Sequence, residues 1–66
     1  MKKETPVRAI VKVMPCYKDQ NFPVAVFVKY HDSNFWQQIS KEYYYKKCAE
    51  REAKRQFLSH YGWQLA

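Results

Sequence analysis

The sequence contains a single glycine, Gly62, among its 66 residues. Both the phosphate-binding P-loop and the dinucleotide-binding fingerprint need several closely spaced glycines, so this chain can build neither. It has only two cysteines, Cys16 and Cys48, whereas a secreted domain of this size usually carries a denser disulfide framework. We therefore expect reduced thiols and a cytoplasmic protein.

Long apolar runs are also missing. No segment approaches the roughly 20 apolar residues that a membrane-spanning helix requires. The first residues hold two lysines, Glu4 and Pro6 in place of the apolar core of a secretory signal. The sequence therefore predicts no membrane partner.

The spacings that metal sites and catalytic sites require are absent too. Two thiols and two imidazoles match the ligand count of a structural zinc site, but they lie 15, 17 and 12 residues apart along the chain, at Cys16, His31, Cys48 and His60. The six acids show no pairing suited to general acid–base catalysis. A domain this small also leaves little room for a ligand pocket. We therefore predict no catalytic residue, no metal, no cofactor and no enzyme activity.

What the chain does have is positive charge. Twelve lysines and arginines against six acids give a net charge of +6, divided evenly between the two halves of the sequence. Such a surplus attracts nucleic acid, anionic membranes or acidic proteins without choosing among them. With 47% hydrophobic residues the chain is apolar enough to fold. We expect one small domain over residues 1–66, with residues 1–5 flexible.

Two segments alternate with the period of a β-strand. Residues 7–14 place Val7, Ala9, Val11 and Val13 on the side expected to face the core, and their neighbours on the other side. Residues 23–31 are apolar on both sides, which is typical of a central strand. A polar tetrapeptide, His31–Asn34, then predicts a tight turn, and residues 35–40 are long enough for a third strand.

The segment after Ser40 permits two interpretations. Ser40 can cap a helix that begins at once, while the three consecutive tyrosines, residues 43–45, suit a continuing strand equally well. From Lys46 the helical pattern dominates, and Gly62 is placed to end the helix near Tyr61 as a left-handed cap.

On that helix two sets of side chains separate. The first set recurs every four residues, is apolar or small, and should pack on the sheet: Tyr45, Ala49, Ala53, Phe57 and Tyr61. The two alanines let the helix come close to the sheet. A basic set occupies an adjoining stripe: Lys47, Arg51, Lys54 and Arg55. The predicted fold is α+β, a three-stranded antiparallel meander with one C-terminal helix packed on one face.

The basic stripe favours a polyanionic partner, with each cation meeting a phosphate. The alternative for the same stripe is a solvated helix face, on which Glu50 and Glu52 pair with Lys54 and Arg55. At least one of the adjacent tyrosines must be exposed, and Tyr43 and Tyr44 are candidates to stack on bases. We therefore predict a small, non-catalytic nucleic-acid-binding accessory protein whose binding residues are Lys47, Arg51, Lys54, Arg55, Tyr43 and Tyr44. The alternative is an interaction or structural module that forms a homodimer or docks on another protein, for which the surplus of aromatic residues is the evidence.

Overall fold

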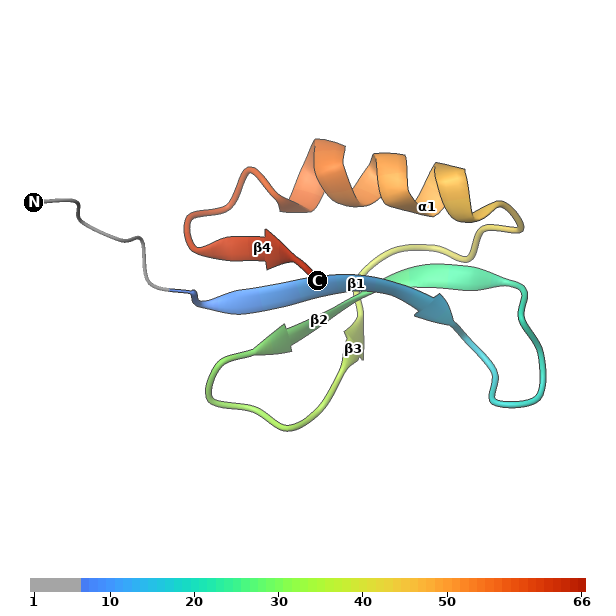
Figure 1. Ribbon diagram of the computed structural model, residues 1–66, viewed down its shortest axis with the longest axis horizontal. Helices are drawn as coiled ribbons and strands as arrows, with labels where there is room; N and C mark the ends of the chain where they lie inside the picture. Colours follow the sequence, from blue (N-terminus) through green and yellow to red (C-terminus); the bar gives the residue numbers. More distant parts are fainter. Residues whose placement is uncertain (1–6) are drawn as a thin grey trace, which may run out of the picture.

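The computed structural model describes residues 7–66, so the expectation of a flexible segment at residues 1–5 lies outside the described residues. Four strands form one mixed sheet in the order β3-β2-β1-β4, and a helix covers one of its faces (Figure 1). The strands are β1 (Ala9–Pro15), β2 (Val24–Tyr30), β3 (Gln37–Gln38) and β4 (Trp63–Leu65). The helix consists of α1 (Lys46–Glu52) and a π-helical turn, η1 (Ala53–Phe57). The α+β class is thus confirmed.

The central pair of strands follows the alternation of the sequence. β1 and β2 are antiparallel, with Val11 opposite Val28 and Val13 opposite Val26, so the valines of both strands share one face. Val11 is completely buried, as predicted for the valine side of residues 7–14, and Val26 and Val28 of β2 are completely buried beside it. Val7, expected on the same side, precedes β1 and is 43% exposed, so this part of the prediction is wrong. Each fully buried valine contributes about 1.5–3 kcal/mol of hydrophobic stabilisation.

The third strand is shorter than predicted. Only Gln37–Gln38 forms a ladder with β2, because at the next position the side-chain oxygen of Ser40 accepts the hydrogen bond from the amide of Val26, at 2.9 Å. Tyr43 then returns to β2 and exchanges two backbone hydrogen bonds with Val24, of 2.7 and 2.8 Å. Ser40 and Tyr43 therefore both bond to β2, and the helix begins at Lys46 with Tyr45, not Ser40, at the N-cap position.

The predicted three-stranded antiparallel meander is wrong, because the residues after the helix add a fourth strand. β4 pairs with β1 in parallel, with Trp63 beside Ala9 and Leu65 beside Val11. A hydrogen bond of 2.8 Å from the amide of Ala66 to the carbonyl of Val11 continues this pairing. The side chain of Trp63 packs against the core, so burying it provides a physical reason for the strand.

The helix also ends earlier than predicted. Its last turn closes with a hydrogen bond from the amide of Leu58 to the carbonyl of Ala53, at 3.1 Å, and η1 ends at Phe57 rather than near Tyr61. Gly62 does adopt the left-handed conformation, with φ of 80°, but it precedes β4 and does not cap the helix. Its carbonyl accepts a hydrogen bond of 2.7 Å from the amide of Arg8, which directs the chain into the sheet.

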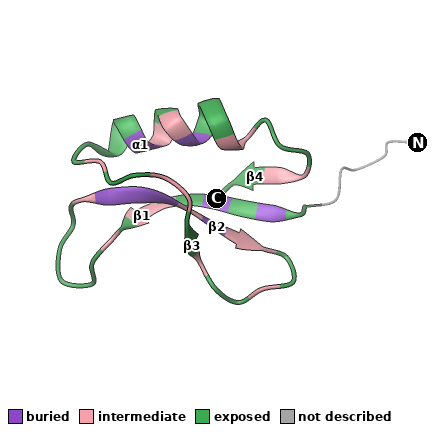
Figure 2. Ribbon diagram, turned by 180° about the vertical axis from the view of Figure 1, so that it is seen from behind, coloured by how far each residue is buried: buried purple, intermediate pink, exposed green. Residues whose placement is uncertain are grey.

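The helix docks on the sheet through small side chains. Ala49 and Ala53 are completely buried, and Phe57 packs against the same core, as predicted. Figure 2 shows the buried stretches of the helix in purple, above the buried stretches of the sheet. A spacing of four drifts by about 40° per step on a helix of 3.6 residues per turn, and the wider π turn compensates for that drift before Phe57. Tyr45 and Tyr61 do not join this face. They lie outside the helix and are 74% and 62% exposed.

Candidate functional site

The outer surface of the helix carries the four cations of the predicted basic stripe. Lys47, Arg51, Lys54 and Arg55 are all exposed, and with Glu50 they line a shallow, open hollow. They are positioned by the docking of the helix, because burying Ala49 and Ala53 turns the opposite side of α1 and η1 to solvent. The structure therefore brings together all four predicted basic residues on one surface.

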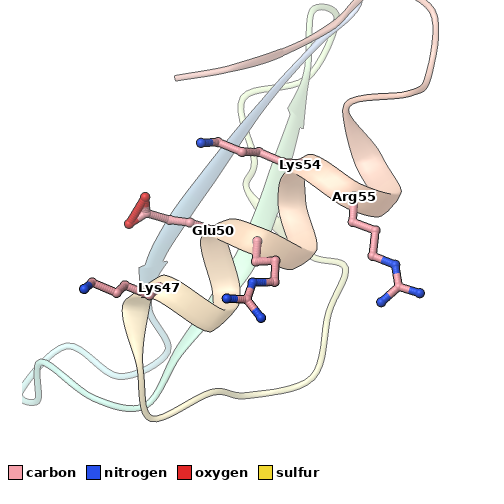
Figure 3. A pocket seen from close by; sticks show the side chains of 5 residues that line it. Lys47, Glu50, Lys54 and Arg55 are labelled. Atoms are coloured by element: carbon pink, nitrogen blue, oxygen red, sulfur yellow. The ribbon is translucent and has the colours of Figure 1, made fainter.

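The stripe divides into two rows around the helix. Lys47, Glu50 and Lys54 follow one row at spacings of three and four, and their side chains extend to the same side of the helix in Figure 3. Arg55 extends to the other side (Figure 3). The carboxylate of Glu50 lies between the two lysines in Figure 3 and opposes the charge of their row, while Glu52 lies three residues before Arg55 on the helix.

The three tyrosines before the helix have different environments. Tyr43 is half-buried against the core, and the ammonium group of Lys41 lies 5.4 Å from the centre of its ring. Tyr44 and Tyr45 are 76% and 74% exposed, which confirms that the three cannot share one core. Tyr44 is thus the predicted stacking residue with a free ring surface, and Tyr45 offers a second one.

A second basic surface lies on the sheet, and the sequence reasoning did not single it out. We call it the open sheet face; it is the side of the sheet opposite the helix, and its side chains include Ile10, Lys12, Met14, Ala25, Phe27, Lys29, Trp36 and Gln38. Lys12 lies directly opposite Phe27, and the ammonium group of Lys29 lies 5.9 Å from the centre of the Trp36 ring. The alternation within each strand already placed Lys12 and Lys29 on the side that does not carry the valines. Only the pairing of β1 with β2 was needed to show that both lysines lie on the same face of the sheet.

One side-chain hydrogen bond joins the loop after β1 to the segment before the helix. The hydroxyl of Tyr17 donates to a carboxylate oxygen of Glu42 at 3.2 Å. This hydrogen bond, with the negative charge of Glu42, raises the pKa of Tyr17 above its ordinary value. Partial burial and the same carboxylate raise the pKa of the Cys16 thiol. A raised pKa lowers the thiolate fraction, so Cys16 is a weak nucleophile at neutral pH.

Metal ligands do not gather in the part of the chain that the structure describes. Across residues 7–66 no group of three or more histidine, cysteine or acidic side chains is placed to hold a metal ion.

Residues 7–66 contain no helix with the length and apolar character needed to span a membrane. Cys16 and Cys48 are free thiols.

Comparisons with known proteins add no family to this description. No family model, no curated protein and no solved structure matches the chain.

Proposed function

We propose that this chain is a small, non-catalytic nucleic-acid-binding protein and that the basic stripe of the helix contacts the phosphate backbone. The observation that carries the proposal is the exposure of Lys47, Arg51, Lys54 and Arg55 on one continuous helix surface. A surface hollow lined by four cations and a single carboxylate attracts an extended polyanion more strongly than a neutral ligand.

The distribution of acids supports a polyanionic partner. Between Lys46 and Phe57 five basic residues stand against Glu50 and Glu52. The four strands contain no acidic residue at all. Positive charge therefore dominates both the helix and the sheet, and the acids of the described chain are confined to the helix and the connecting segments.

Aromatic side chains next to the stripe add a second kind of contact. Tyr44 and Tyr45 immediately precede α1, are mostly exposed and are followed by Lys46 and Lys47. An exposed ring beside a cation can stack on a base or pack on a sugar while the cation meets the phosphate. Tyr44 is the residue of this pair that we assign to the interface. Tyr43 supports it from the core rim.

The test is a salt titration of binding to labelled single-stranded and duplex oligonucleotides. The variant Arg51→Glu plus Arg55→Glu reverses two charges of the stripe and changes the net charge by four. A matched control, Lys18→Glu plus Lys41→Glu, changes the net charge equally at two exposed positions away from the helix. The proposal predicts a large loss of affinity and a shallower salt dependence in the stripe variant, with a smaller loss in the control.

Two outcomes would refute the proposal. If the wild-type protein binds neither oligonucleotide at low salt, the chain is not a nucleic-acid-binding protein. If the stripe variant binds as tightly as the control and with the same salt dependence, general attraction by net charge explains the binding and the stripe has no specific role.

A second candidate function rests on a different observation. Five aromatic residues are more than half exposed, and such surfaces are enriched in protein interfaces: Tyr17, Phe35, Tyr44, Tyr45 and Tyr61. A self-associating or protein-docking module would use them. Sedimentation equilibrium distinguishes self-association, because a strict monomer at high concentration excludes a homodimer.

A further inference from the structure

The open sheet face combines aromatic rings and cations, and the acid nearest to it in the lining of a surface hollow is Glu50 of the helix, which shares that hollow with Lys12. Strand pairing places Lys12 opposite Phe27, and Gln38 on the other side of Phe27. Two residues further along β2, Lys29 lies beside Trp36. Because β1, β2, β3 and β4 contain no acid, nothing within the strands neutralises Lys12 and Lys29.

The helix does not cover this face. Among residues 7–66 the single helix packs on the opposite face, against Val11, Val26 and Val28. Phe27, Lys29 and Trp36 are half-buried, and Lys12 is exposed. Phe27 lies within β2 and Trp36 immediately before β3, and part of each ring remains accessible.

We propose that the open sheet face binds single-stranded nucleic acid, with bases stacked on Phe27 and Trp36 and with Lys12 and Lys29 contacting phosphates. The inference rests on the proposed nucleic-acid function, and it adds a second surface and a preference for single strands. Phe27 pairs with Gln38 of β3, and Trp36 lies two residues before Gln38, immediately ahead of the strand. Diagonal neighbours at such positions are about 7–8 Å apart, which lets each ring take its own base. Unpaired bases expose the π faces that such stacking requires, whereas a duplex keeps them inside its stack.

Charge complementarity argues against a second copy of this chain as the occupant of the open sheet face. In a symmetric pair of copies packed through this face, Lys12 and Lys29 would be taken out of water against a surface with no acid in its strands. A polyanionic strand satisfies the same lysines. On binding, a base that stacks on Trp36 displaces the ammonium group of Lys29, which is then free to reach the neighbouring phosphate.

The two tryptophans make the inference testable because they report on opposite faces. Trp36 lies on the open sheet face, while Trp63 packs on the core side against Tyr30, Phe57 and His60. Trp63→Phe leaves Trp36 as the only indole, and Trp36→Phe leaves Trp63. Each variant is titrated with oligo-dT and with duplex dA·dT while its fluorescence is recorded.

The inference predicts that oligo-dT quenches the fluorescence of the Trp63→Phe variant and leaves that of the Trp36→Phe variant nearly unchanged, with weaker quenching by the duplex. Trp36→Ala should lower the affinity for oligo-dT by roughly 5- to 150-fold, the loss of one stacked base. Circular dichroism of each variant establishes that it is folded.

The outcomes separate this inference from the proposed function. If oligo-dT and the duplex bind equally and Trp36 fluorescence does not respond, the open sheet face is not the site, and binding through the helix stripe stands. If no oligonucleotide binds at low salt, both proposals fail. If an acidic peptide quenches Trp36 as strongly as oligo-dT at equal charge, the face recognises negative charge in general and the assignment to single strands is wrong.

Discussion

Reversing two charges of the helix stripe should change the salt dependence of binding by a calculable amount. Four phosphate contacts on duplex DNA give a slope of about −3.6 for log affinity against log salt, since each contact contributes about −0.9. Raising the salt from about 50 to 200 mM then weakens binding by about 150-fold. Arg51→Glu plus Arg55→Glu removes two contacts, which leaves a slope of about −1.8 and a loss of about 12-fold over the same range.

The assay is fluorescence anisotropy of a labelled duplex at several salt concentrations, with Lys18→Glu plus Lys41→Glu as the control for net charge. Both double variants lower the net charge from +6 to +2, and all four altered residues are exposed, so folding should be preserved. A wild-type slope near zero would contradict the reasoning. So would a slope that falls equally in the stripe variant and in the control, because the position of the charges would then not matter.

Further predictions concern packing and titration. Ala53→Leu should destabilise the fold by about 1–3 kcal/mol in chemical denaturation, because the completely buried methyl group leaves no room for a larger side chain; an unchanged midpoint would refute the close approach of helix and sheet. The raised pKa of Tyr17 favours its protonated form in the folded state, so its contribution to stability is present below about pH 10 and is lost as the pH rises further. Melting temperatures of wild type and Tyr17→Phe should therefore converge at alkaline pH, and curves that stay parallel would argue against the hydrogen bond to Glu42. Iodoacetamide should modify the exposed Cys48 before the partly buried Cys16, whose pKa is raised, as peptide mass mapping can establish; the reverse order would contradict the structure.

The sequence predicted the central strands well because their signal is local. Alternation in residues 7–14 and 23–31 needs only the two-residue period of a strand, and β1 carries the buried Ala9 and Val11 on the predicted side. Ala49 and Ala53 were identified as the docking face for the same reason, from a regular spacing within one helix.

The errors arose where pairing across the sheet decides the structure. β4 has only three residues, too few for a periodic pattern, and it forms because Trp63 packs on the core beside Ala9. Ser40 carries the side chain of a helix cap, yet its hydroxyl accepts a hydrogen bond from Val26 across the sheet. Neither the pairing of β4 with β1 nor the hydrogen bond between Val26 and Ser40 can be identified from the local sequence.

The two surfaces of the candidate site differ in the same way in how far the sequence predicts them. The basic stripe could be read from helical spacing alone, and the structure places all four cations on one exposed surface. The open sheet face could not be predicted from the sequence, because it depends on which strands are neighbours. Lys29 and Trp36 lie close together only because β2 pairs with β3 and Trp36 directly precedes β3.

The central claim is that this chain binds nucleic acid through its cationic surfaces. The most direct test is a titration of the ¹⁵N-labelled protein with oligo-dT, followed through the amide signals in two-dimensional NMR spectra. The account predicts shifts concentrated in two patches, over α1 and η1 around Arg51 and Arg55 and on the open sheet face around Phe27 and Trp36. Spectra that do not change at low salt, or shifts confined to segments outside both patches, would contradict it.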